Sequence, residues 1–215
     1  KRQQRSRPDR PLNRPAYQGS NPISDIWALE AIRLTSENLV TAVKNPENLE
    51  ARSKMILASS MAGMGFGNSG VHLCHGMSYP VSGMVRSYQP DGLNIKHPII
   101  PHGMSVILNA PAVFRFTASA SPDRHLTLAE ILGADCSSVQ SPKEEAGDVL
   151  AGCIVKLMKD LDIPNGLSAV GYTDQDIPKL VAGTLPQHRV TKMSPKSAEA
   201  EDLTKMFTES LIAWN

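Results

Sequence analysis

Apolar side chains recur at helical spacing along most of this chain. From Asn21, with Ser24 as the expected N-cap, such a pattern runs to Lys44. A second helix is expected to start near Pro46 and to run to about Met61, where a series of glycines is expected to loosen it. No stretch alternates convincingly with a period of two, so strands should be scarce. The pattern predicts an all-α fold of about seven or eight helices.

The remaining segments extend this prediction. A short buried helix is expected over residues 71–79, ended by Pro80 or continuing briefly beyond it, and the Gly- and Pro-containing segment 86–101 is expected to be a loop. Further helices are expected to open at His102, over residues 111–120, from Ser121 to a stop at Gly133, and over 172–183 with Thr173 as the cap. Two amphipathic helices follow the same rule, and their expected inward side chains are Val149, Leu150, Cys153, Ile154, Leu157 and Met158 in the first, and Leu203, Met206, Phe207 and Leu211 in the second.

Composition narrows the function classes. With 215 residues, of which 41% are hydrophobic, the chain can bury the core of one domain. A net charge of +1 creates no field that favours nucleic acid or an anionic membrane. Residues 55–84 carry no charge apart from two histidines, but six glycines and a proline exclude one membrane-spanning helix. We therefore expect neither a nucleic-acid nor a membrane partner.

Residues 1–20 differ in composition from the rest. They contain six basic side chains, one acid and three prolines, which is too little apolar surface to offset the entropy of ordering. We expect a disordered basic arm at 1–20 and a helical domain at 21–215. A solvated linker is favoured over an Arg-rich targeting peptide, which Asp and repeated prolines do not suit. It is also favoured over a nucleic-acid-binding arm, because residues 1–14 have no aromatic side chains between the basic ones and no basic helix follows.

The three cysteines show no CxxC spacing and are odd in number, which favours a reducing compartment and buried or inert thiols.

Four of the six histidines fall within 31 residues: His72, His75, His97 and His102. Neutral imidazole is the commonest protein ligand for a transition metal. Divalent metals usually recruit at least one carboxylate as well, and between residues 51 and 122 the single carboxylate is Asp91. The cluster is therefore expected to be part of a metal site rather than the whole of one.

His75 and His102 are the strongest pair, since one lies on a buried helix and the other opens the next helix. Helices of a bundle commonly present ligands to one interior point, although two unrelated core or surface histidines would give the same pattern. His72 stands three residues before His75 and could either join the pair or simply pack. His97 and His125 are expected to be solvated, and His188 to lie in a polar turn.

Two motifs carry a family resemblance. The run GFGNSGVHLCHGMSYPVSG, followed by HPIIPHGMSVILNAPAV, resembles the C-terminal half of the iron-dependent alcohol dehydrogenase family. The resemblance implies the multi-helix metal-binding domain of the dehydroquinate-synthase-like fold, with ferrous iron or zinc as the metal. It also implies that His75 and His102 are metal ligands and that Phe66 lines the pocket for nicotinamide and substrate. Tyr79 stands where many members have a catalytic histidine, so a tyrosine hydrogen bond or slower relay is expected there.

Two parts of the family pattern do not occur in this sequence. There is no Asp four residues before a His, which the family's first two metal ligands require, and no Gly-rich turn after a strand for a pyrophosphate. The family's N-terminal α/β dinucleotide domain is thus not among these residues. We expect the 215 residues to be part of a longer protein and to be inactive alone.

For the longer protein, the resemblance implies a mitochondrial oxidoreductase in which 4-hydroxybutyrate gives a hydride to bound NAD and 2-oxoglutarate takes it. The partners would be a small hydroxy acid and a small oxo acid, and a homo-oligomer is compatible with the family. The alternative from a different class is a non-catalytic helical module that binds another protein through apolar surface exposed around residues 61–70.

Overall fold

The computed structural model describes residues 19–92 and 95–215, and these fold into ten α-helices without a strand. The prediction of an all-α fold is confirmed, and the predicted arm lies almost wholly outside the described residues. The helix count of seven or eight was too low, and the helix without a counterpart among the expected segments is one of only four residues that follows residue 187. Two short 3₁₀ turns, η2 (Ser168–Val170) and η3 (Asp174–Asp176), join α7 to α8. The α-helices are α1 (Pro22–Lys44), α2 (Leu49–Ser69), α3 (Leu73–Gly83), α4 (His102–Ile107), α5 (Ala110–Ala118), α6 (Pro122–Ile131), α7 (Pro142–Asp160), α8 (Ile177–Thr184), α9 (His188–Thr191) and α10 (Ala200–Ser210).

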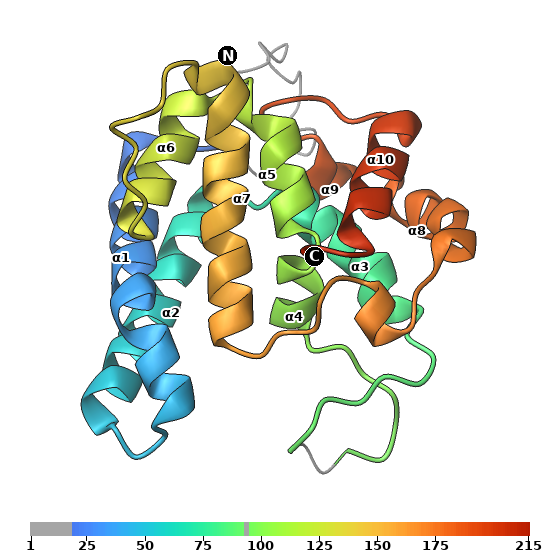
Figure 1. The fold of residues 1–215 in the computed structure, drawn as a ribbon, viewed down its shortest axis with the longest axis horizontal. Coiled ribbons are helices and arrows are strands. Elements are labelled where there is room, and N and C mark those ends of the chain that lie inside the picture. The colour runs from blue at the N-terminus through green and yellow to red at the C-terminus, as the bar shows by residue number, and fades with distance from the viewer. Residues whose placement is uncertain (1–18, 93–94) are drawn as a thin grey trace, which may run out of the picture.

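Helices α1 and α2 form an antiparallel pair along one edge of the molecule (Figure 1). Helix α7 runs through the middle against α5 and α6, while α3, α8 and α10 pack together on the other side. The segment between α3 and α4 projects away from the bundle and returns to it, as the predicted loop requires. This return brings the start of α4 against α3.

The first helix is capped one turn earlier than predicted. Asn21 is the N-cap, and its side-chain oxygen accepts a hydrogen bond from the backbone N–H of Ser24 at 3.0 Å. Ser24 itself is buried inside the first turn, so the prediction that it caps the helix was wrong. An Asn before a Pro at the first helical position is an equally good start signal, since the cap side chain satisfies an otherwise orphaned N–H.

The glycines of α2 do not end it, which corrects the second boundary prediction. The helix starts at Leu49 and continues to Ser69, because Gly65 faces α1 at close range. A Cβ on Gly65 would lie 3.2 Å from the backbone nitrogen of Ala28 and 3.3 Å from the carbonyl oxygen of Ser24. Glycine therefore lets the two backbones approach, and the packing gained offsets its poor helix propensity.

Pro80 lies inside α3, which continues to Gly83. Of the two predicted outcomes, continuation beyond the proline is the correct one. Pro80 is buried against α8, where a Cβ on Gly183 would come within 2.8 Å of the proline ring. Tertiary packing thus holds a helix that the local rule would end.

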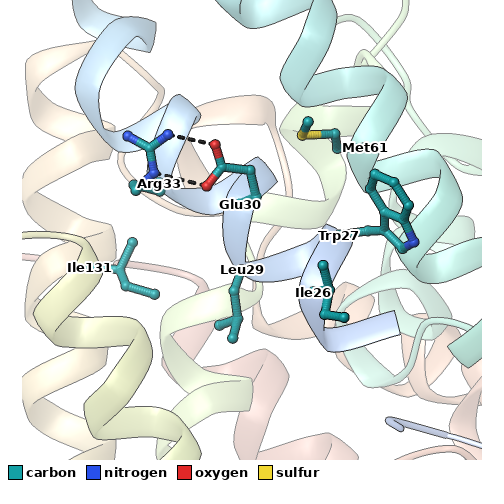
Figure 2. Close-up of a pocket in the computed structure, with 7 residues that line it drawn as sticks. All are labelled: Ile26, Trp27, Leu29, Glu30, Arg33, Met61 and Ile131. Carbon is teal, nitrogen blue, oxygen red and sulfur yellow. Dashed lines mark hydrogen bonds and ion pairs between the residues drawn. The ribbon is translucent and has the colours of Figure 1, made fainter. Parts of the chain in front are cut away.

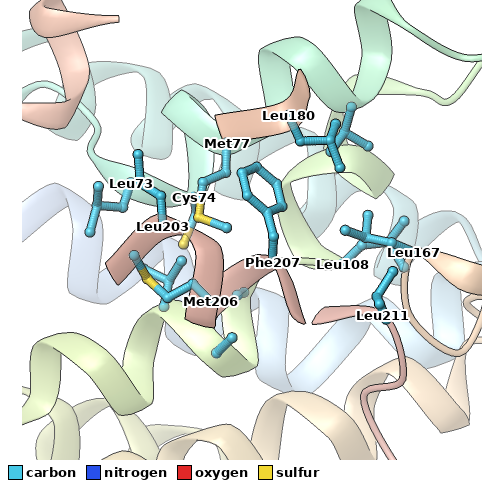
Figure 3. Close-up of a cluster of buried hydrophobic side chains, with 14 of the residues drawn as sticks. Leu73, Cys74, Met77, Leu108, Leu167, Leu180, Leu203, Met206, Phe207 and Leu211 are labelled. Atoms are coloured by element: carbon cyan, nitrogen blue, oxygen red, sulfur yellow. The ribbon is translucent and has the colours of Figure 1, made fainter. Parts of the chain in front are cut away.

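The hydrophobic core lies where α3, α5, α7, α8 and α10 meet (Figure 3). The four side chains predicted to face inward from the last helix are all buried, and Phe207 has no exposed surface. In α7, Leu150, Ile154 and Met158 are buried as predicted, while the other three members of the predicted face are half-buried. The core fixes α3, and through it the segment that carries the histidines.

In the part of the chain that the structure describes, no helix is both long enough and apolar enough to cross a membrane.

Candidate functional site

The structure brings His75 of α3 and His102 of α4 together. Their ring centroids are 5.2 Å apart and the ring planes are inclined by 59°, although 27 positions separate them in sequence. His75 is half-buried, and its pKa is lowered from the ordinary value by burial first and by the nearby His102 second. His75 is therefore a neutral imidazole at pH 7, with a free lone pair for a metal.

Tyr79 adds a third ring to this pair. It lies one turn after His75 on α3, and its ring stacks on His102 with centroids 6.4 Å apart and planes inclined by 14°. Tyr79 as a whole is 38% exposed. The structure thus places a side chain with a hydroxyl group beside His102.

The spacing of the two imidazoles suits one metal ion. Imidazoles bound to a single zinc-sized ion have centroids roughly 5 Å apart, because each metal–nitrogen bond is about 2.0–2.1 Å long. Among the described residues, no group of three or more His, Cys, Asp or Glu side chains is placed to hold a metal. The pair therefore fits half of a tetrahedral coordination sphere, and the other ligands have to come from elsewhere.

His72 is not a third member of the pair. It occupies the N-cap position of α3, and its ring meets Phe114 edge-on with centroids 6.5 Å apart. Its Nδ1 atom is buried and has no hydrogen-bond partner among the described residues. Of the two roles considered for His72, packing is the one that the structure supports.

Burial lowers the pKa of His72 from 6.5 to about 4, with smaller contributions from His125 and His75. The unfolded chain therefore binds this proton more readily, so stability is complete above pH 6.5 and declines as the pH falls toward 4. We expect the free energy of unfolding of His72→Phe, measured by urea titration between pH 7.5 and 4.5, to decline less steeply with falling pH than that of the wild type. The difference in slope should correspond to about one proton fewer taken up on unfolding. An unchanged slope would contradict this assignment.

His125 is buried, so the prediction that it is solvated was wrong. Its Nε2 atom lies 3.0 Å from the hydroxyl of Thr117, and its Nδ1 atom lies 2.8 Å from the carbonyl oxygen of Ser121. Its neighbour Arg124 is the side chain that reaches outward, to an ion pair with Asp25 of α1. The polar composition of a first turn does not show whether a given side chain points into the protein or into solvent. His125 points toward α5.

The remaining candidates are two histidines and the three cysteines. His97 is exposed in the loop as predicted, and His188 begins α9 rather than lying in a turn. The three cysteines are free thiols, and burial raises the pKa of the Cys74 thiol to about 12. Such a thiol is inert at neutral pH.

Phe66 and one imidazole of the pair, His102, are exposed to solvent. Phe66 is 52% exposed near the end of α2, and His102 is also exposed. The ring contacts of His102 are with His75 and Tyr79, and Phe66 is not one of its partners. A pocket that excludes water at these residues would therefore need a further part of the protein to cover it.

A hollow of about 510 Å³ lies elsewhere, between α1, α2 and α6 (Figure 2). The cation in its lining, Arg33, is neutralised by Glu30 and Glu37. None of the residues that line the hollow carries an imidazole or a thiol, so it is not the candidate site. Its lining is Ile26, Trp27, Leu29, Glu30, Arg33, Met61 and Ile131.

A short repeat, which the expectations above did not use, links the two histidines. The same four residues, HGMS, occur at both positions, as His75 to Ser78 and as His102 to Ser105. Both serines are completely buried, and each hydroxyl donates a 2.8 Å hydrogen bond to the carbonyl oxygen of its own histidine. The repeat is visible in the sequence alone, and its serine makes the same local hydrogen bond at both positions.

Comparison with known proteins identifies the chain's relatives. Residues 16–211 match the model of the Fe-containing alcohol dehydrogenase family, C-terminal. The chain is 56% identical over 204 residues to the mitochondrial hydroxyacid-oxoacid transhydrogenase of Bos taurus, and 57% identical over 204 residues to that of Homo sapiens. Each alignment covers 95% of this chain and 43% of the relative, so the chain spans less than half the length of these proteins.

Solved structures show the same fold. A 1,3-propanediol oxidoreductase superposes with a TM-score of 0.78 at 26% identity, covering 90% of this chain and 46% of that one. An alcohol dehydrogenase from Oenococcus oeni superposes with a TM-score of 0.77 at 28% identity, covering 88% of this chain and 45% of that one. The all-helical arrangement described above is thus shared with part of these longer oxidoreductases.

Proposed function

Because this chain belongs to the Fe-containing alcohol dehydrogenase family, we propose that it supplies the helical metal-binding half of a mitochondrial hydroxyacid-oxoacid transhydrogenase. The observation that carries the proposal is the pair of imidazoles 5.2 Å apart at the two motif positions. The identity of 55–57% to enzymes of that name supports the substrate class and the compartment.

The proposed reaction passes a hydride between two small acids. The carbinol carbon of 4-hydroxybutyrate gives a hydride to NAD⁺ and its hydroxyl loses a proton, which leaves succinate semialdehyde. The NADH returns the hydride to the keto carbon of 2-oxoglutarate, whose oxygen takes a proton, which leaves 2-hydroxyglutarate. The two half-reactions balance, so no external oxidant or reductant is consumed.

His75 and His102 would hold the metal. A bound ferrous or zinc ion supplies Lewis-acid chemistry, because it lowers the pKa of a coordinated hydroxyl group. His75 needs no deprotonation to bind it at pH 7, since burial already keeps the ring neutral. The stacked ring of Tyr79 orients His102, and the Tyr79 hydroxyl is available to donate a hydrogen bond to a substrate oxygen.

The missing ligands and the NAD site belong, in this proposal, to the part of the longer protein that these residues do not include. Five large apolar side chains along α2 are at least 42% exposed, and a surface of that kind normally contacts another molecule or domain. We infer that the dinucleotide-binding part covers this surface and excludes water from the site. The five are Leu49, Ile56, Leu57, Met64 and Phe66.

The same exposed side chains also favour a second candidate, a non-catalytic helical module that binds a partner protein. In that case the imidazole pair would have no catalytic use, and the chain would act without NAD or metal. The two candidates differ in what accompanies the chain in the cell.

The test is to isolate the native protein from mitochondria with an antibody against this chain, and to measure its mass, metal, nucleotide and activity on one sample. The expected result is a polypeptide well above 23.3 kDa that contains iron or zinc and NAD. It should form 2-hydroxyglutarate from 4-hydroxybutyrate and 2-oxoglutarate without added NAD. A 23.3 kDa protein free of metal and nucleotide, with no product formed, would instead establish the second candidate.

A further inference from the structure

A hydroxyl pair joins the two helices that carry the histidines. The hydroxyl of Ser82 in α3 donates a 2.8 Å hydrogen bond to the hydroxyl of Ser105 in α4. Ser82 lies seven residues after His75, two helical turns along, and so takes the same face of α3. Resting on the metal site of the proposed function, we propose that Ser82 and Ser105 are positioning residues that set the separation of the His75 and His102 rings.

Two hydrogen bonds in series connect Ser82 of α3 to the backbone of His102 in α4. Ser105 accepts from Ser82 and donates in turn to the carbonyl oxygen of His102, at 2.8 Å. Ser105 has no exposed surface and Ser82 is half-buried, so the link is largely shielded from water. Hydrogen bonds in such a chain polarise and strengthen one another in a low-dielectric interior. The backbone of His102 is therefore tied to the helix that carries His75.

Helix α4 depends on this kind of contact. It has six residues, too few to be stable in isolation, and His102 is its first residue after the long loop. His102 thus has no helical turn before it to hold it in place. Loss of the bridge would let the start of α4 shift relative to α3, and metal ligands tolerate only small displacements.

Ser78 provides a matched control within the same protein. It is the serine of the other HGMS sequence, is equally buried, and makes the same local bond to the carbonyl oxygen of its histidine at 2.8 Å. It differs from Ser105 in lying inside an eleven-residue helix, where its hydroxyl bonds within α3 rather than across to α4. Ser78→Ala therefore removes a buried hydroxyl and a local hydrogen bond without removing the bridge.

The experiment measures the Co²⁺ affinity of the metal-free full-length protein by calorimetry and by visible absorption, with circular dichroism to verify folding. Ser82→Ala and Ser105→Ala should each weaken Co²⁺ binding roughly tenfold, and the double variant should be no weaker than either single variant, because all three break one link. Ser82→Thr keeps the hydroxyl and should restore the affinity, while Ser78→Ala should leave it unchanged. Unchanged affinity in the Ser82 and Ser105 variants, or an equal loss in Ser78→Ala, would overturn the proposal.

A further comparison separates this inference from the proposed metal site. If the wild-type protein binds Co²⁺ no better than His75→Ala does, the metal assignment fails. The positioning role of Ser82 and Ser105 is then tested by a nuclear Overhauser contact between the two imidazoles. Such a contact should be present in the wild type and in Ser78→Ala, and absent in Ser82→Ala and Ser105→Ala. Its persistence in the latter two would show that the hydroxyl pair does not position the rings.

Discussion

Replacing His75 by alanine in the full-length protein is expected to remove the bound metal and to lower kcat/KM by at least about 100-fold, since loss of outer-shell partners alone costs 10–100-fold. His102→Ala should have the same effect, because the described residues offer the metal these two imidazoles and no larger ligand group. Metal content and turnover should fall together, while the helical circular dichroism signal stays close to that of the wild type. Metal analysis and steady-state kinetics on the same preparations measure this.

His97→Ala is the matched control. His97 belongs to the same histidine-rich segment but is exposed in the loop, and the ring contacts of His102 are with His75 and Tyr79 instead. Its replacement should leave metal content and kcat/KM at wild-type values. Full turnover with retained metal in His75→Ala or His102→Ala would remove the ligand assignment.

Replacing Gly166 by alanine is expected to destabilise the fold by at least about 3 kcal/mol. Gly166 has φ +74°, and a Cβ there would lie 2.7 Å from the carbonyl oxygen of Ser210 and still closer to that of Leu211. Those two carbonyl oxygens accept the N–H groups of the residues that follow Gly166, at 2.8 and 3.0 Å. The end of α10 cannot move away without breaking both hydrogen bonds. The backbone strain at positive φ and the clash of the added Cβ therefore both contribute to the loss of stability.

Gly152→Ala is the control variant for Gly166→Ala, and urea denaturation measures the free energy of unfolding of both. Gly152 is an exposed glycine within α7, and a Cβ added there meets nothing within 4 Å among the described residues. Alanine should stabilise this helix by about 0.5–1 kcal/mol. If Gly166→Ala cost less than about 1 kcal/mol, the close approach of Gly166 to the end of α10 would be wrong.

Local signals were sufficient for much of the fold. The start of α6 after Ser121, the capping box of Thr173 and Asp176, and the buried face of α10 follow from side-chain chemistry within one or two turns. Each was predictable because the physical cause and its effect lie close in sequence.

Long-range contacts explain the errors. The continuation of α2 through Gly65 depends on the backbone of α1, and that of α3 through Pro80 depends on Gly183 of α8. His125 is buried because α5 supplies Thr117 beside it. None of these neighbours can be identified from the residues flanking the position itself, so local reasoning was wrong at the glycines of α2 and at His125, and left two outcomes open at Pro80.

The candidate site shows the same limit. The sequence marked His75 and His102 as candidates, but it did not establish that the long loop between α3 and α4 returns one ring to within 5.2 Å of the other. Their expected role came from the family resemblance rather than from spacing. The Ser82 to Ser105 bridge joins two helices and has no local signature beyond the repeated HGMS sequence.

The most direct test of the account is anomalous X-ray diffraction from crystals of the metal-loaded full-length protein. One metal peak should appear within about 2.0–2.3 Å of a ring nitrogen of both His75 and His102, as expected for coordinated imidazoles. A peak that contacts only one of these rings, or that lies elsewhere in the protein, would contradict the claim that the two histidines converge on a single ion.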